Sequence, residues 1–119
     1  MATVELTAEN FEEVVSRPGT VLVDFWASWC GPCRMFAPVF EQASQRHPDI
    51  TFGKVNTETQ PGLAQAFGIS SIPTLIAVRD GVMLYAQPGA LPAPALEQLI
   101  DAVGRLDMNE VRASAKRPA

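Results

Sequence analysis

The chain has only two cysteines, Cys30 and Cys33, and they stand two residues apart in the segment WASWCGPCRMFAP. Such a pair can staple a fold, supply half of a metal site, or act as a redox couple. A staple would contribute only about 2 kcal/mol, because the loop it closes is very short. A structural zinc site needs four nitrogen or sulfur ligands, and the chain adds only His47, expected at the surface near a helix end. A metal shared between two chains and a structural disulfide remain alternatives to redox exchange.

Redox exchange fits the spacing of the pair best. Residues i and i+3 in the first turn of a helix share a face, with β-carbons about 5–6 Å apart, and a modest adjustment brings them to disulfide distance. Cys30 would lie at the helix N-terminus, where unpaired N–H groups and the helix dipole stabilise a thiolate. Cys33, one turn further on, should be more buried. We therefore expect Cys30 to attack a substrate disulfide and Cys33 to resolve the mixed disulfide.

The elements that must position this pair alternate along the chain. Apolar and polar patterns predict strands at 3–6, 21–27 and 50–56, and a hairpin of 74–78 with 82–86 around Arg79-Asp80-Gly81. Four helices are predicted. The first follows Thr7 as its cap, and the second starts within 30–33 and runs to about His47. The third covers 61–67, and the fourth runs from near Pro92 to a stop at Gly104. This order predicts an α/β fold, a mixed sheet with helices on both faces.

Composition limits the possible functions. With 119 residues, of which 47% are hydrophobic, the chain fits one globular domain. The N-terminal segment MATVELTAEN does not resemble a signal peptide, and no apolar run approaches the roughly 20 residues of a membrane helix. We therefore expect a cytoplasmic protein that is not bound to a membrane. The net charge of −4 gives no reason to expect nucleic acid as a partner.

Several motifs together resemble one family, the thioredoxins. WCGPC at 29–33 follows VDFWA at 23–27, and the matching positions continue with Pro38, Lys54, SIPT at 71–74 and Gly89. The resemblance covers roughly residues 3–103. It implies the thioredoxin fold, a five-stranded mixed β-sheet with two helices on each face, over residues 1–103, followed by a short C-terminal extension at 104–119. It also implies a protein-disulfide reductase with no bound cofactor and a redox-active Cys30–Cys33 disulfide.

Asp24 and Lys54 are candidate helpers of the cysteines. Asp24 lies in the apolar strand at 21–27, where burial should raise its pKa. An aspartate satisfied by a structural hydrogen bond or ion pair is the alternative, and for Lys54 the alternative is an ordinary solvated lysine. The resemblance implies that Asp24 accepts a proton from Cys33, through water, and that Lys54 tunes this carboxylate.

The resemblance also implies a surface that docks the substrate strand through backbone hydrogen bonds. Its members are expected to be Trp29, Gly31, Pro32, Ile72, Pro73 and Gly89, with a cis bond before Pro73. The Gly-Pro pair between the cysteines adds no positive charge, which favours a reductant over an oxidant. Three features depart from the commonest pattern of the family: Ser28 in place of an acidic residue, Pro88 before Gly89, and the segment VNTE at 55–58.

The expected partners follow from the same resemblance. The chain has no glycine-rich nucleotide motif, so its electrons must come from another protein, and the family implies an NADPH-dependent, flavin-containing thioredoxin reductase. Expected substrates are disulfide-containing proteins such as ribonucleotide reductase, peroxiredoxins and methionine sulfoxide reductases. The chain itself is expected to be a monomer. A thioredoxin-fold binding module or holdase that does not use its thiols is the alternative function.

The C-terminal extension differs in charge from the domain. Residues 1–103 carry 11 acids and 5 bases, whereas residues 104–119 carry 2 acids and 4 bases. Asp107 is expected to cap a short helix that starts at Met108. Its apolar face is small, so we expect weak docking, and mobility after Ser114.

Overall fold

The computed structural model describes the backbone of residues 2–115 and the side chains of residues 2–114. These residues form one sheet with the strand order β1-β3-β2-β4-β5. The strands are β1 (Thr3–Glu5), β2 (Thr20–Trp26), β3 (Thr51–Asn56), β4 (Thr74–Arg79) and β5 (Val82–Pro88). The helices are α1 (Phe11–Val15), α2 (Gly31–Arg46), α3 (Pro61–Ala66), α4 (Ala93–Arg105) and α5 (Met108–Ala115).

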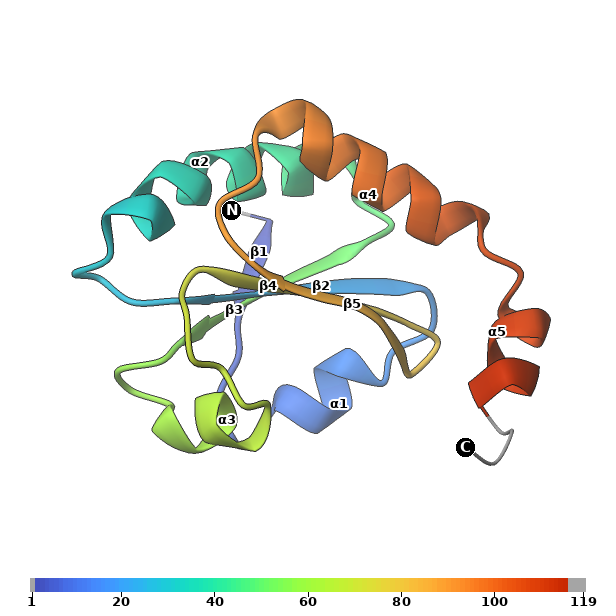
Figure 1. The fold of residues 1–119 in the computed structure, drawn as a ribbon, viewed down its shortest axis with the longest axis horizontal. Helices are drawn as coiled ribbons and strands as arrows, with labels where there is room; N and C mark the ends of the chain where they lie inside the picture. The colour runs from blue at the N-terminus through green and yellow to red at the C-terminus, as the bar shows by residue number, and fades with distance from the viewer. Residues whose placement is uncertain (1, 116–119) are drawn as a thin grey trace.

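The sheet is mixed, and helices cover both of its faces. Strands β1 and β2 run parallel to β3, while β4 is antiparallel to both β2 and β5. Figure 1 shows α2 and α4 on one face and α1 and α3 on the other. The predicted five-stranded mixed sheet with two helices on each face is therefore confirmed, and α5 follows α4 as an addition to it.

The central strand β2 separates two apolar layers. Because side chains alternate along a strand, Leu22 faces α2 and α4, while Val21 and Val23 face α1 and α3. Both layers are buried, which explains why β2 is apolar at both parities. Asp24 has the parity of Leu22, so its carboxyl group points toward the helix layer that carries the cysteines.

The hairpin between β4 and β5 forms where the sequence predicts it. Asp80 and Gly81 make a two-residue turn with φ values of 51° and 81°. Two successive positive φ angles are the signature of the type I′ turn, which matches the twist of the paired strands.

Two predicted helix boundaries are wrong. Helix α1 begins at Phe11 with Asn10 at its N-cap position, and the Thr7 hydroxyl accepts a bond only from Glu9 N–H, at 3.3 Å, in the turn before it. Helix α4 does not stop at Gly104 but continues to Arg105.

Contacts from the hairpin explain the longer α4. The Arg79 guanidinium donates hydrogen bonds to the carbonyl oxygens of Val103, Gly104 and Leu106, at 2.9, 3.2 and 2.8 Å. The last carbonyls of a helix have no partner within it, so these bonds stabilise the turn that contains Gly104.

The helix predicted to start at Met108 is present as α5. Asp107 Oδ1 accepts hydrogen bonds from the N–H groups of Asn109 and Glu110, at 2.9 and 3.4 Å, as expected of a cap. Met108 is buried and Val111 is half-buried. Residues 116–119, which hold most of the expected mobile tail, lie outside the described residues. Between residues 2 and 115, no helix is long and apolar enough to cross a membrane.

Candidate functional site

The paired cysteines lie where β2 leads into α2. Cys30 is the N-cap residue of α2, with φ −88° and ψ 114°, and Gly31 and Pro32 open the helix. This extended conformation is typical of an N-cap, and proline is tolerated in the first turn because its missing N–H would have no helical partner. Cys30 and Cys33 are disulfide-bonded, with their Cα atoms 5.2 Å apart. The prediction that the pair reaches disulfide distance is confirmed.

Position distinguishes the two sulfur atoms more than burial does. The exposed fractions of Cys30 and Cys33 are 4% and 2%, so the expected difference in burial is small. The N–H group of Cys33 points at Cys30 Sγ, 3.2 Å away, at the N-terminus of α2. A negative charge on Cys30 would be stabilised there by this N–H group and by the helix dipole.

The disulfide is bordered by the loop that precedes β4. The carbonyl oxygen of Ile72 lies 3.6 Å from Cys30 Sγ, and Ile72 packs against the buried group formed by Ala27 and the two cysteines. The Ile72–Pro73 peptide bond is cis, as the resemblance implied. Thr74 secures this loop by donating a hydrogen bond to the carbonyl oxygen of Ser71, at 2.5 Å.

Of the residues expected to dock substrate, some are exposed and others are partly or fully buried. Trp29 is 69% exposed, and Pro32 is exposed. Gly31 and Ile72 are half-buried, whereas Pro73 is buried. Gly89 is exposed at φ 112°, a conformation that favours glycine, and its N–H group donates to the carbonyl oxygen of Pro73 at 2.8 Å. Pro73 can therefore shape the loop that displays Ile72 but offers little surface itself.

Asp24 is almost completely removed from water. Its exposed fraction is 1%, and neither carboxyl oxygen has a hydrogen-bond partner among the described residues. No described protein group therefore supplies the structural hydrogen bond of the alternative, and its other form, an ion pair, would have to involve Lys54. Burial raises the pKa of Asp24 from 3.8 to about 7, because an ionised carboxylate loses its hydration, and the positive charge of Lys54 offsets part of this rise.

Lys54 lies beside Asp24 on the neighbouring strand. The two residues are register partners of β2 and β3. The Lys54 ammonium lies 5.0 Å from the centre of the Trp26 ring, a cation–π distance. The residue is half-buried, so part of the Lys54 side chain is removed from water.

A cavity of about 410 Å³ adjoins Lys54 on the side of β1. Its wall is formed by Thr3, Glu5, Trp26, Glu41, Lys54 and Asn56. Glu41 holds the first strand there, because its carboxylate accepts hydrogen bonds from Ala2 N–H and the Thr3 hydroxyl, at 3.2 and 3.0 Å. These bonds lower the pKa of Glu41, so the wall of the cavity holds a stable negative charge as well as the Lys54 ammonium.

Sequence reasoning missed three contributors to this region. Met35, two residues beyond Cys33 on α2, is 74% exposed, and its only signal is an apolar residue on the polar side of an amphipathic helix. Arg34 and Glu58 both bind Ser28, next to Trp29. In the sequence, Ser28 and the segment 55–58 stand out only as departures from the family pattern, and nothing there indicates that Ser28 and Glu58 form hydrogen bonds with each other. Within residues 2–115, no three His, Cys, Asp or Glu side chains gather as a metal site would require.

Comparison with known proteins gives consistent matches. The sequence model of the thioredoxin family matches residues 2–102. A Streptomyces coelicolor protein with the name "Putative thioredoxin 2" is 60% identical over 111 residues, 93% of this chain and 83% of that protein. Thioredoxin of Alicyclobacillus acidocaldarius is 46% identical over 102 residues, 84% of this chain and 97% of its own length.

A solved structure agrees with these sequence matches. A mutant thioredoxin from Halobacterium salinarum NRC-1 has a TM-score of 0.81 and 31% sequence identity, and the likeness covers 88% of this chain and 93% of that one.

Proposed function

Because the chain belongs to the thioredoxin family, we propose that it reduces protein disulfides, with Cys30 as the nucleophile and Cys33 as the resolving thiol. The chain is a thiol–disulfide oxidoreductase, as its relatives are. The observation that carries the proposal is the position of Cys30 at the N-cap of α2, with Cys33 N–H directed at its sulfur.

The reaction proceeds in two exchanges. The Cys30 thiolate attacks one sulfur of the substrate disulfide, forms a mixed disulfide and expels the first substrate thiolate. Cys33 loses its proton and attacks Cys30 Sγ, which forms the Cys30–Cys33 disulfide and expels the second substrate thiolate. Two electrons thus pass from the dithiol to the substrate. The two substrate thiolates are protonated by the proton that Cys33 gives up and by one from solution, which balances the proton that Cys30 lost on ionising.

Asp24 is proposed as the proton acceptor for Cys33. A pKa of about 7 lets a carboxyl group accept and return a proton near neutral pH, where an ordinary aspartate would be a weak base. The parity of Asp24 on β2 directs its carboxyl group toward the side of the sheet where α2 begins. We propose that water completes the path between the two groups and that Lys54 keeps the ionised form accessible.

Substrate docking is proposed at the rim of the disulfide. Trp29, Gly31 and Pro32 present exposed or half-exposed surface on one side, and Ile72 does so on the other. The substrate chain would lie along Ile72 and Gly89 and pair with their backbones, which gives affinity without demanding one sequence. Such docking suits a protein with several substrates.

Re-reduction is proposed to come from a thioredoxin reductase that takes electrons from NADPH. The proposed setting is the cytoplasm, where reducing conditions keep such pairs in the dithiol form. The proposed partners are the protein substrates of the family: ribonucleotide reductase, peroxiredoxins and methionine sulfoxide reductases. We propose a monomer as the working form.

A coupled assay tests this function. Insulin is the substrate, a bacterial thioredoxin reductase is the electron source, and NADPH consumption is followed by its absorbance, in parallel with insulin reduction by dithiothreitol. The wild-type chain should accelerate both reactions, and Cys30→Ser should accelerate neither. If the wild-type chain fails with both reductants although its thiols are intact, the binding-module alternative replaces the proposal.

A further inference from the structure

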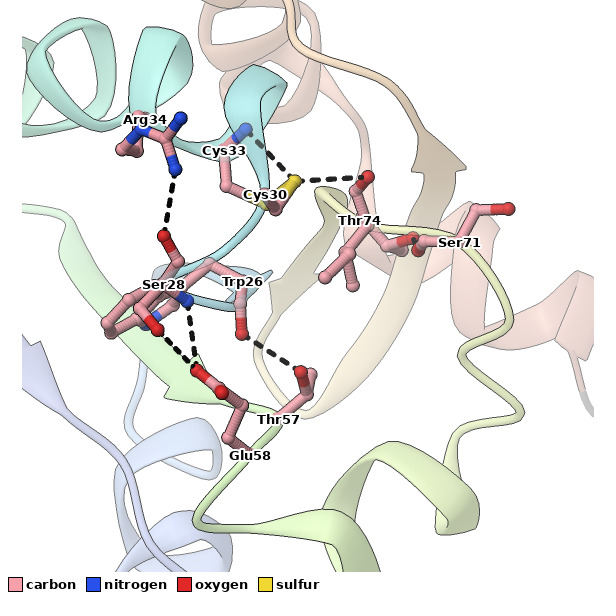
Figure 2. Close-up of a disulfide and its surroundings, with 10 residues drawn as sticks. Trp26, Ser28, Cys30, Cys33, Arg34, Thr57, Glu58, Ser71 and Thr74 are labelled. Carbon is pink, nitrogen blue, oxygen red and sulfur yellow. Dashed lines mark hydrogen bonds between the residues drawn. A yellow bond between two sulfur atoms is a disulfide. The ribbon is translucent and has the colours of Figure 1, made fainter.

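The backbone of Ser28 is held by two side chains from different elements, Glu58 on one side and Arg34 on the other. Glu58 Oε1, in the loop after β3, accepts hydrogen bonds from the Ser28 N–H group at 3.0 Å and from its hydroxyl at 2.7 Å. The Arg34 guanidinium, from the first turns of α2, donates to the Ser28 carbonyl oxygen at 2.9 Å. Figure 2 shows Arg34 and Glu58 approaching Ser28 from opposite sides.

The held residue lies in a tight turn that carries Trp29. The Cys30 N–H group donates to the Ala27 carbonyl oxygen at 3.3 Å, so Ser28 and Trp29 are the two central residues of a turn. This closing bond is longer than the usual N–H···O distance and restrains the turn only weakly. The N–H and carbonyl groups of Ser28 face outward, where Glu58 and Arg34 bind them.

The Glu58 side of this contact is itself fixed to the sheet. The N–H group and the hydroxyl of Thr57 both donate to the Trp26 carbonyl oxygen, at 2.8 and 3.0 Å. Asn56 Oδ1 accepts a bond from the Glu58 N–H group at 2.9 Å. The loop after β3 therefore continues the β2–β3 pairing beyond the end of the sheet, and Glu58 presents its carboxylate to Ser28 from a fixed backbone.

We propose that Glu58, with Arg34 opposite it, is a positioning residue for substrate docking: it fixes the Ser28–Trp29 turn so that the exposed indole borders the disulfide before a protein substrate arrives. This inference rests on the proposed function and extends it to residues that do not touch the reacting sulfur atoms.

The effect should appear in docking rather than in stability. Ser28, Arg34 and Glu58 are all exposed, so water can replace each lost bond and the folded state loses little. A loosened turn must instead be ordered when substrate binds, which weakens binding by the cost of that ordering. Reduction of a small disulfide that does not need the indole surface should not change.

Kinetics of four variants test the proposal. Reduced protein is mixed with excess insulin, or with cystine, the reaction is quenched by alkylation, and the residual thiols of Cys30 and Cys33 are counted by mass. Glu58→Ala removes the acceptor, and Glu58→Gln keeps a carbonyl oxygen at the same place without the charge. Ser28→Ala removes only the hydroxyl donor. Glu9→Ala, an exposed glutamate in the turn before α1, is the control for loss of a surface charge.

Positioning predicts that Glu58→Ala raises the half-saturating insulin concentration about 3- to 10-fold, with the limiting rate within about twofold. For Glu58→Gln and Glu9→Ala this concentration should stay within about twofold of wild type, and for Ser28→Ala it should lie between the wild-type and Glu58→Ala values. Cystine reduction should be unchanged in all four variants.

A half-saturating insulin concentration that does not change in Glu58→Ala overturns the proposal. So does the same increase in Glu58→Gln, because the effect would then belong to the charge. If Glu58→Ala does not fold, an unaffected Ser28→Ala overturns it. The wild-type rate with insulin tests the proposed function separately.

Discussion

Replacing Asp24 with asparagine removes a carboxyl group that the fold keeps almost entirely away from water. The pKa of this group rises from 3.8 to about 7 on folding because burial disfavours the ionised form. At about 1.4 kcal/mol for each pKa unit, this rise corresponds to about 4 kcal/mol of stability that the folded state lacks when the carboxyl is ionised.

The sign follows from the protons bound in each state. Below pH 3.8 the carboxyl is protonated in both the folded and the unfolded chain. As the pH rises toward 7, the unfolded chain loses this proton while the folded chain keeps it, so the free energy of unfolding falls. Above about pH 7 both states are ionised, and the loss becomes constant.

Asparagine removes this pH dependence but introduces a cost of its own. Its buried amide would lack hydrogen-bond partners as the carboxyl does, which should lower the free energy of unfolding by about 1–3 kcal/mol at every pH. The free energy of unfolding of Asp24→Asn minus that of wild type should therefore rise by about 2–3 kcal/mol between pH 5 and pH 8. The variant should be the more stable protein at pH 8.

Urea unfolding of the oxidised proteins at several pH values measures this difference, with Asp49→Asn as the control for an exposed aspartate. Resolution of the mixed disulfide should also slow by at least about tenfold near pH 7, because the proton acceptor is lost. A stability difference that stays constant from pH 5 to pH 8 would refute the assignment of a raised pKa. A fully active variant would refute the assignment of Asp24 as the proton acceptor.

Three further predictions concern the cysteines, the packing under β3 and the extension. Iodoacetamide should alkylate Cys30 of the reduced protein before Cys33 near neutral pH, and preferential labelling of Cys33 by peptide mapping would reverse their roles. Gly53→Ala should lower the free energy of unfolding by about 1–3 kcal/mol, because the new methyl group would lie 2.5 Å from Cδ1 of the fully buried Leu6. An unchanged urea midpoint would mean that this leucine moves freely. Deletion of residues 107–119 should keep insulin reduction within about twofold and cost no more than about 1–2 kcal/mol, and a large loss of activity would identify the extension as a binding element.

The sequence predicts the Cys30–Cys33 pairing and the burial of Asp24 because the signals for both are local. Cys30 and Cys33 are one helical turn apart, and Asp24 lies in an apolar strand just before them, so spacing and hydrophobic pattern suffice. The lack of a hydrogen-bond partner for Asp24 among the described residues does not follow from that pattern, which left a structural hydrogen bond or ion pair open.

The contacts that the sequence did not predict join segments far apart in the chain. Arg79 lies 25 residues before Gly104, and its bonds to the carbonyls of α4 override the helix-stopping tendency of that glycine. Ser28 and Glu58 are separated by 30 residues and meet only because β2 and β3 are parallel neighbours. Such contacts depend on which strands are neighbours in the sheet and on which loop residues this brings together, and the local sequence pattern contains neither.

Trapping the mixed disulfide tests the central claim most directly. Reduced Cys33→Ser is mixed with insulin, thiols are blocked, and the adduct is mapped by mass spectrometry under non-reducing conditions. The mechanism predicts a stable adduct through Cys30 that dithiothreitol releases, and none from Cys30→Ser. An adduct that forms through Cys33 in Cys30→Ser as readily as through Cys30 in Cys33→Ser would contradict the assignment of the nucleophile.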